Sequence, residues 1–472
     1  MDAPPSARVD TRPDQRLVAL TQQFACETHP GRSYAVTLDT SFERDLGFDS
    51  LARVELMLRV GKTFGVEMPG EALSEADTAR DVLRFLGQAQ PQSAALFEAA
   101  LDTPQALDVP DHAETLLEVL EWYAARQPDR VHILLHDDRH QEHPIRYRDL
   151  LDASLAIAAG LSAQGLQPRQ TVALMLPTGR DYLACFFGVM FAGGIPVPIY
   201  PPTRLAKIED HLKRHAGILS NAEATLIITV TQAKPVARML QAAVPSLSAI
   251  VTPQELGTAP SMPRRRAQGD DIAFLQYTSG STGDPKGVVL THTNLLSNIR
   301  ALGQAARVVP ADVFVSWLPL YHDMGLIGAW FGSLYHGIPL ILMSPLAFLA
   351  RPTLWLQTIM RYRGTISAAP NFAYELCVRH VDDATLAGLD LSTWRLAFNG
   401  AEPVSPSTIT SFASRFAPFG LQQQTITPVY GLAESSVGLA FPPLGRGPRI
   451  DPILNEPFAR VGKAMPATNS DA

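Results

Sequence analysis

A glycine- and hydroxyl-rich run in the middle of the chain has the composition of a phosphate-binding loop. Residues 277–287 read Tyr-Thr-Ser-Gly-Ser-Thr-Gly-Asp-Pro-Lys-Gly. Glycine allows a tight bend whose backbone N–H groups converge on an anion, hydroxyls donate further hydrogen bonds, and a lysine supplies compensating charge. The residues predicted to form this cradle are Thr278, Ser279, Gly280, Ser281, Thr282, Gly283 and Lys286.

Two other interpretations of this run are weaker. A Walker loop needs the spacing G-x-x-x-x-G-K-[ST], which is missing, and a following helix, whereas Val288, Val289 and Leu290 predict a strand. The structural alternative is a β-hairpin turn. Such turns rarely need three glycines, four hydroxyls and a lysine within eleven residues, so phosphate binding is favoured.

A second chemical signal surrounds Ser50. Residues 45–51 read Asp-Leu-Gly-Phe-Asp-Ser-Leu, and Leu51, Val54, Met57 and Leu58 then recur on one helical face. The pattern predicts that Ser50 begins a helix, with an aspartate just before it. One interpretation is that Ser50 only caps this helix.

The order of glycine, acid, serine and leucine in a short helical unit resembles acyl and peptidyl carrier proteins, whose G-x-D-S-L motif matches residues 47–51. The resemblance implies a four-helix carrier with 4′-phosphopantetheine on Ser50. A thiol on a flexible arm is a better nucleophile and leaving group than a hydroxyl. Carrier proteins commonly show an acidic face on this helix, but here Arg53, Arg59 and Lys62 outnumber Glu55.

The elements that position these motifs differ between the two parts of the chain. Up to residue 90 the segments are short and helical, and residues 78–81 predict a capping box that opens a helix over 82–86. Residues 171–230 alternate apolar strands with amphipathic helices, the pattern of a parallel sheet covered on both faces. Strands are predicted at 172–176, 195–200 and 224–230.

Between these parts, residues 88–111 contain three prolines and little periodicity, which predicts an interdomain linker. A helix over 115–126 then opens the large domain. Residues 324–350 carry no Asp, Glu, Lys or Arg over more than the ~20 residues that a membrane helix needs. Glycines and prolines divide this stretch, so a buried helix, a turn and a strand at 339–343 are predicted instead of a membrane span.

Composition excludes several classes of function. The chain has 472 residues, 39 basic and 46 acidic side chains and a net charge of −7, so it shows no electrostatic footprint for nucleic acid. Its three cysteines lie far apart, without a CxxC, which favours a reducing compartment and argues against structural zinc. The N-terminus has no apolar segment of a secretory signal, so a cytoplasmic location is expected.

Three further motifs follow the loop. Residues 319–326 read Pro-Leu-Tyr-His-Asp-Met-Gly-Leu, residues 399–403 Asn-Gly-Ala-Glu-Pro, and residues 430–434 Tyr-Gly-Leu-Ala-Glu. Together with the loop they resemble the acyl-adenylate-forming superfamily. Residues 275–277, 316–319, 344–352, 370–374 and 389–395 are most similar to the fatty acyl-AMP ligases, and the resemblance covers about residues 115–465.

This resemblance implies a multidomain protein, with a small all-α four-helix carrier followed by a large α/β adenylate-forming domain of two βα subdomains and an incomplete β-barrel. The implied boundaries are 13–90 for the carrier, 91–111 for the linker and 112–472 for the adenylation domain. The loop would hold the ATP phosphates and Glu434 would hold Mg²⁺, an ion that prefers carboxylates and phosphates. The residues that would enclose adenine are Gly400, Ala401, Glu402, Tyr430 and Gly431.

The residues assigned to catalysis by the same resemblance are Lys286, His322 and Glu434. A carboxylate attacks the α-phosphorus of ATP and pyrophosphate leaves, so charge neutralisation and alignment matter more than a base. We therefore assign His322 a gating or positioning role beside the reacting carboxylate. A purely structural histidine is the alternative.

Apolar side chains near these motifs suit an alkyl tail, whereas an amino-acid substrate would need a carboxylate for its ammonium group. The candidates are Met324, Leu326, Trp330, Phe372 and Tyr374, although core packing is an equally good explanation for any one of them. His132 and Asp137 have the H-x4-D spacing of glycerolipid acyltransferases. They lie in an apolar strand-like run, so that interpretation is disfavoured.

The end of the chain departs from the family. Related ligases continue with an aspartate for the ribose and a C-terminal lid bearing a catalytic lysine, but after Glu434 only 38 residues follow, with Lys463, Asp451 and Asp471. We therefore expect an adenylation domain without its lid, and little turnover from this fragment alone.

Two hypotheses follow. The first is ATP-dependent activation of a fatty acid and transfer of the acyl group to a phosphopantetheine thiol, with a phosphopantetheinyl transferase and a downstream synthase or acyltransferase as partners. The second is a noncatalytic carrier and nucleotide-binding module that needs another chain.

Overall fold

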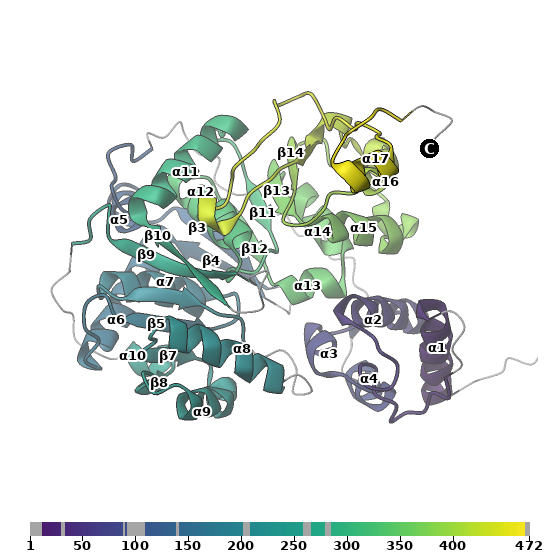
Figure 1. Ribbon diagram of the computed structural model, residues 1–472, viewed down its shortest axis with the longest axis horizontal. Coiled ribbons are helices and arrows are strands. Elements are labelled where there is room, and N and C mark those ends of the chain that lie inside the picture. The colour runs from purple at the N-terminus through teal and green to yellow at the C-terminus, as the bar shows by residue number, and fades with distance from the viewer. Residues whose placement is uncertain are drawn as a thin grey trace, which may run out of the picture.

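The computed structural model describes residues 12–29, 34–87, 90–91, 109–137, 141–201, 208–257, 266–278 and 285–467. Its N-terminal part is a bundle of four helices, α1 (Pro13–Thr28), α2 (Ser50–Phe64), α3 (Gly70–Glu75) and α4 (Ala79–Leu86), shown in purple in Figure 1. The apolar faces of these helices enclose Leu17, Phe24, Met57 and Val82, all buried. The four-helix carrier expected from the sequence is confirmed.

Local signals place the ends of these helices. The Thr78 hydroxyl accepts a hydrogen bond from the Asp81 N–H and the Asp81 carboxylate accepts one in return, so the predicted capping box is confirmed and α4 begins at Ala79. A short antiparallel pair, β1 (Val66–Glu67) with β2 (Gln90–Pro91), extends the carrier into residues first assigned to the linker. Most of that linker, residues 92–108, lies outside the described part of the chain.

The large domain contains two mostly parallel sheets. The first has seven strands in the order β15 (Ile426–Pro428), β14 (Leu396–Asn399), β13 (Ile366–Ala369), β11 (Phe314–Ser316), β12 (Leu340–Met343), β3 (Val131–His136) and β4 (Glu142–Arg146), and only β4 runs antiparallel to its neighbour. The second has four parallel strands, β6 (Ile195–Pro198), β5 (Thr171–Met175), β7 (Leu226–Thr229) and β8 (Ala249–Val251). β5, β6 and β7 confirm the three predicted strands, with ends shifted by up to two residues.

Helices cover these sheets, so the strands are apolar on both faces. The helices of the first half are α5 (Leu116–Arg126), α6 (Tyr147–Ala163), α7 (Arg180–Phe191), α8 (Ile208–Asn221), η1 (Thr231–Ala233), α9 (Lys234–Ala243), α10 (Pro253–Leu256) and α11 (His292–Ala306). Those of the second half are η2 (Met324–Phe331), α12 (Gly332–His336), α13 (Pro345–Ala350), α14 (Thr353–Arg361), α15 (Asn371–His380), η3 (Asp383–Leu386), α16 (Pro406–Phe416), η4 (Ala417–Phe419), η5 (Gln423–Thr425), η6 (Ala433–Ser435) and α17 (Asn455–Val461).

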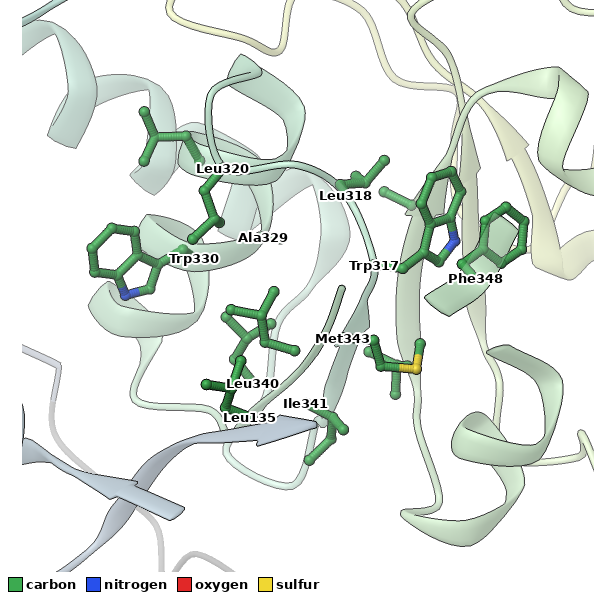
Figure 2. Close-up of a cluster of buried hydrophobic side chains, with 14 of the residues drawn as sticks. Leu135, Trp317, Leu318, Leu320, Ala329, Trp330, Leu340, Ile341, Met343 and Phe348 are labelled. Atoms are coloured by element: carbon green, nitrogen blue, oxygen red, sulfur yellow. The ribbon is translucent and has the colours of Figure 1, made fainter. Parts of the chain in front are cut away.

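The uncharged stretch 324–350 is divided as predicted. It forms the π-helix η2, the short helix α12, a left-handed turn at Gly337 and the buried strand β12. Within the described residues, no helix has the length and apolar character needed to cross a membrane. Figure 2 shows the core around this stretch, where the Trp330 side chain on η2 and the Leu340 side chain on β12 point inward and Trp317 lies against Phe348.

The phosphate-loop run connects two antiparallel strands, β9 (Ile272–Thr278) and β10 (Lys286–Thr291), with Thr278 paired to Lys286. The expectation that the run is not a hairpin connection is therefore wrong. A hairpin connection and a phosphate cradle are compatible, because the paired strands only fix the two ends of the run.

The C-terminal part differs from the incomplete β-barrel expected by resemblance. Residues 429–467 form the isolated bridges Tyr430 to Ala440 and Ile453 to Pro466 together with α17, and no strand in this described segment. The segment contains Pro442, Pro443, Pro448, Pro452 and Pro457. Proline cannot donate to a strand ladder, which accounts for the missing strands.

Candidate active site

A cavity of about 410 Å³ opens between the hairpin β9–β10, the turn before η2 and the loop after β15. Its size lies in the range of small-molecule sites. The predicted site residues that line it are Thr278, His322, Ala401, Tyr430, Gly431 and Glu434. Residues of all four sequence motifs, spread over positions 278 to 434, therefore meet at one cavity.

The other part of the cavity wall is apolar and was not predicted. Helix α11 contributes Ile299, Leu302, Gly303 and Ala306, and the continuous helix η2–α12 contributes Met324, Gly328, Gly332 and His336. The second set recurs every four residues, so it forms one stripe along a helical face. By α-helical rise this stripe extends up to roughly 18 Å from the end of the helix next to His322.

Two glycines give the stripe its shape. A Cβ placed on Gly328 would meet no atom within 4 Å, so the missing side chain leaves open space in the cavity wall. A Cβ on Gly303 would instead collide with the His336 ring, so glycine leaves room for this ring between α11 and α12. The sequence signal for this wall was the pair Gly328 and Gly332, which lie four residues apart in an apolar helix.

Only one of the five apolar side chains proposed for an alkyl tail lines the cavity, and that is Met324. Leu326, Trp330 and Tyr374 are buried in the core, and Phe372 packs beside Trp317 with ring centroids 6.1 Å apart. The core-packing explanation is therefore correct for these four side chains. Leu326 and Trp330 lie on η2, which does line the cavity, but these two side chains are buried away from it, and α15, which carries Phe372 and Tyr374, contributes none of the lining residues.

His322 lies at the mouth of the cavity with its side chain 50% exposed. Its Nδ1 atom is 2.8 Å from Asp323 Oδ1, and the Met324 N–H donates a 2.7 Å hydrogen bond to that same oxygen. Burial lowers the pKa of His322, but the hydrogen bond and charge of Asp323 outweigh burial and leave it above its ordinary value of 6.5. The Asp323 carboxylate therefore stabilises the protonated form of the His322 imidazole.

The substitution Asp323→Asn tests this arrangement. Because Asp323 raises the pKa of His322, the variant should titrate His322 at lower pH than the wild type, as measured by imidazole NMR. In the wild type the pair's contribution to stability is complete below pH 6.5 and is lost as the pH rises through the raised pKa. His132, whose pKa burial lowers to about 3, serves as the unchanged internal reference. An identical His322 midpoint in both proteins contradicts the assignment.

The two ends of the phosphate loop flank the cavity mouth. Thr278 lines the cavity, and Lys286 is its antiparallel partner on β10, with an exposed side chain. The central predicted residues, Ser279 to Gly283, lie outside the described part of the chain. The phosphate role of the loop therefore stays a prediction.

The predicted adenine residues divide into two groups. Ala401 lines the cavity and has φ of 67°, a strained value for a residue with a side chain and one that clusters at functional sites. Gly400 and Glu402 do not line it, and the Glu402 carboxylate instead accepts a 2.6 Å hydrogen bond from the Phe372 N–H at the start of α15. Glu402 thus has a contact within the protein, and its role at adenine stays a prediction.

Glu434 is the acidic residue of η6 that faces the cavity. No group of three or more His, Cys, Asp or Glu side chains suited to a metal ion occurs among the described residues. Mg²⁺ is commonly held by one or two carboxylates with substrate phosphates, so a single carboxylate near the loop fits this ion.

Ser50 is the first residue of α2, and the N-cap is Asp49, whose Oδ1 accepts a 2.8 Å hydrogen bond from the Ala52 N–H. Ser50 is therefore not the residue that caps the helix, which removes the structural explanation for it. The start of a helix also favours a nearby negative charge such as a phosphodiester.

The H-x4-D spacing of His132 and Asp137 has a structural explanation. His132 lies fully buried on β3 with its ring stacked on Tyr147 at 4.9 Å, and the Asp137 carboxylate contacts His143. The two residues do not form a catalytic pair, in agreement with the disfavoured acyltransferase interpretation.

Comparisons with known proteins identify the family of this chain. The chain is 37% identical over 330 residues to the medium-chain-fatty-acid–[acyl-carrier-protein] ligase JamA of Moorena producens, covering 68% of this chain and 55% of that protein. It is 34% identical over 361 residues to TtuA of Teredinibacter turnerae, which is also named a medium-chain-fatty-acid–[acyl-carrier-protein] ligase. This match covers 68% of this chain and 56% of that protein. It thus spans about half the length of the curated relatives it matches.

Solved structures extend the comparison. A structure from a study of fatty acyl-adenylate ligases from E. coli and L. pneumophila superposes with a TM-score of 0.72 and 32% identity, covering 76% of this chain and 64% of that one. A fatty acyl-adenylate ligase from L. pneumophila in complex with acyl adenylate and pyrophosphate superposes with a TM-score of 0.69 and 33% sequence identity. The match covers 77% of this chain and 63% of that one. A phosphopantetheine attachment site profile matches residues 30–86, and the profile of the AMP-binding enzymes matches residues 120–470. The chain therefore belongs to the AMP-binding enzymes and carries a phosphopantetheine-attachment domain at its N-terminal end.

Proposed function

We propose that this protein activates a fatty acid with ATP and passes the acyl group to a phosphopantetheine thiol on a carrier domain. The observation that carries the proposal is the cavity, in which charged and hydroxyl side chains at the mouth continue into an apolar channel between α11 and η2–α12. The carboxylate of a fatty acid would fill the polar mouth of the cavity, and its alkyl chain would lie along the stripe on η2–α12. The relatives named for fatty-acid–carrier ligation support the same substrate class.

The cavity residues then have distinct roles in adenylate formation. The fatty acid carboxylate attacks the α-phosphorus of ATP, the bond to the bridging oxygen breaks, and pyrophosphate leaves. Thr278 and Lys286 hold the phosphates from the two ends of the loop, and His322, at the cavity mouth, orients the carboxylate group. Tyr430, Gly431 and Ala401 lie on the wall that would receive adenine.

Two bound groups complete the proposal. Glu434 would hold Mg²⁺, which neutralises charge that develops on the phosphates. The phosphopantetheine arm, attached at Ser50 by a phosphopantetheinyl transferase, would supply the thiol that attacks the acyl carbonyl carbon of the adenylate, so that the bond from this carbon to the phosphate oxygen breaks and AMP leaves. We place the reaction in the cytoplasm, because the cysteines are free and two of them, Cys185 and Cys377, are buried. A synthase or acyltransferase would use the loaded carrier.

Substrate-dependent exchange of pyrophosphate into ATP tests the proposal. We expect medium- and long-chain fatty acids to support exchange with Mg²⁺ and amino acids not to, because no carboxylate lines the apolar part of the cavity to pair with an ammonium group. The assay is run on residues 1–472 and on the natural polypeptide that carries them. Exchange with an amino acid at the fatty-acid rate, or none with any fatty acid in the natural polypeptide, would refute the proposal and favour a noncatalytic module.

A further inference from the structure

The carrier lies against one face of the large domain. Helices α2 and α3 are next to α13 and the C-terminal end of α15, as Figure 1 shows below the label α13. Two charge contacts join the domains, Lys62 Nζ to Asp382 Oδ1 at 2.6 Å and His380 Nε2 to Glu55 Oε2 at 2.6 Å. At Gly70 the backbones come close, since a Cβ there would lie 3.2 Å from Leu346 Cβ.

This face explains the unusual charge of α2. Arg53 is buried inside the carrier, where its guanidinium contacts the Asp77 carboxylate and the Ala76 carbonyl. Arg59 pairs with Glu27 on α1 and with Glu55 on its own helix. Both arginines therefore have ionic partners within the carrier, so the excess of basic residues on α2 is in part balanced inside that domain.

The charges that cross to the large domain are Glu55 and Lys62, and each meets the opposite charge. His380, when protonated, pairs with the acid, and Asp382 pairs with the base. The Glu55 and His380 side chains are only 19% and 14% exposed, and the hydrogen bond and charge of His380 are the first causes that lower the pKa of Glu55. The Lys62 pair is exposed and weaker.

We infer that the face made by α13 and residues 380–382 is a docking surface for the carrier of this same chain, recognised by the pairs Glu55–His380 and Lys62–Asp382 and by the close approach at Gly70. This rests on the proposed function, since it assigns the carrier on which the acyl group is placed. A carrier with an acid at the position of Lys62 would bring two carboxylates together at Asp382. The surface therefore selects the chain's own carrier over one whose helix is acidic throughout.

The docking surface is also close to the residues around the cavity. Phe348 of α13 stacks on Trp317 with ring centroids 3.9 Å apart, and Figure 2 shows these two rings face to face. Trp317 begins the segment that leads to the turn at His322. The carrier is thus held beside the element that supports this turn.

Amide hydrogen exchange in the full chain, without ATP or fatty acid, tests the docking. Charge reversal by Lys62→Glu should raise exchange of the amides in α13 and at the end of α15 by about two- to fivefold, the range expected for one ion pair. Asp382→Lys should do the same, and the double variant should restore protection because the pair is re-formed with opposite polarity. Gly70→Leu should raise exchange in both the wild-type and double-variant backgrounds, because a side chain there meets Leu346.

Arg44→Glu is the matched control, since the Arg44 side chain is 82% exposed on the carrier and forms an ion pair with its neighbour Asp45. Wild-type exchange in Lys62→Glu, Asp382→Lys and Gly70→Leu, or failure of the double variant to restore protection, would overturn the inference. A second measurement follows acyl transfer to the attached carrier in competition with an excess of a separate acidic carrier. Lys62→Glu should reduce the preference for the attached carrier by the same factor as in the exchange experiment, about two- to fivefold. Loss of fatty-acid activation with normal exchange behaviour would count against the proposed function alone, because the exchange experiment uses no substrate.

Discussion

Alanine at position 50 is expected to abolish attachment of 4′-phosphopantetheine completely. The transfer forms a bond between the serine oxygen and phosphorus, and alanine has no oxygen to form it. Because Asp49 and not Ser50 caps α2, the substitution should leave the helix and the carrier core intact, with a stability change below about 0.5 kcal/mol. Intact-protein mass after incubation with a phosphopantetheinyl transferase and coenzyme A measures the result directly.

Two variants separate chemistry from folding in this experiment. Thr63→Ala removes an exposed hydroxyl from the same helix and should label like the wild type. Asp49→Ala removes the N-cap hydrogen bond, at a cost of about 1 kcal/mol, but keeps the serine, so it should still accept one pantetheine group. Full labelling of Ser50→Ala would show that another side chain is the attachment point.

The parts of the fold that the sequence predicted are those with strong local signals. Strands β5, β6 and β7 are short apolar runs between turns, and their parallel pairing follows from the helices between them. The capping box at Thr78 and the start of α2 at Ser50 depend on residues within one helical turn. These signals act between residues close in sequence, so the elements that they predict form in the folded protein whatever the long-range contacts are.

The site was predicted less completely because a cavity depends on the direction of side chains. Leu326 and Trp330 were chosen for their apolar character, yet they face the core, while Met324 and Gly328 on the same helix face the cavity. The π-helical geometry of η2 shifts the faces relative to an ordinary α-helix, and composition does not reveal that shift.

Long-range contacts explain the other differences. Glu402 lies in a motif with a nucleotide role, but the free N–H at the start of α15 binds its carboxylate. The charge pattern of α2 could be read from the sequence, yet which of its charges face outward depends on the positions of Asp77 and Glu27. These partners are distant in sequence, so no local pattern identifies them.

The substitution Glu434→Gln is expected to lower the rate of acyl-adenylate formation by about 10²-fold or more, equivalent to roughly 2.7 kcal/mol of transition-state stabilisation. Glutamine keeps the size and shape of the side chain at the cavity wall but removes the negative charge that would hold Mg²⁺ against the ATP phosphates. The fold should therefore be unchanged while the metal-dependent step is impaired. Pyrophosphate exchange in the natural polypeptide at a series of Mg²⁺ concentrations measures the effect.

The Mg²⁺ series separates the proposed role from a general loss of activity. If Glu434 holds the ion, Glu434→Gln should need more Mg²⁺ for half-maximal rate, whereas fatty-acid binding measured without nucleotide should stay the same, because the apolar channel lies along α11 and η2–α12. Glu456→Gln, on the exposed helix α17, removes an acid outside the cavity and should behave like the wild type. Lys286→Ala should also slow exchange by about 10²-fold, but without changing the Mg²⁺ requirement, since a lysine contacts phosphate directly. Wild-type rates in Glu434→Gln, or an unchanged Mg²⁺ dependence despite a slower rate, would show that the ion is held elsewhere.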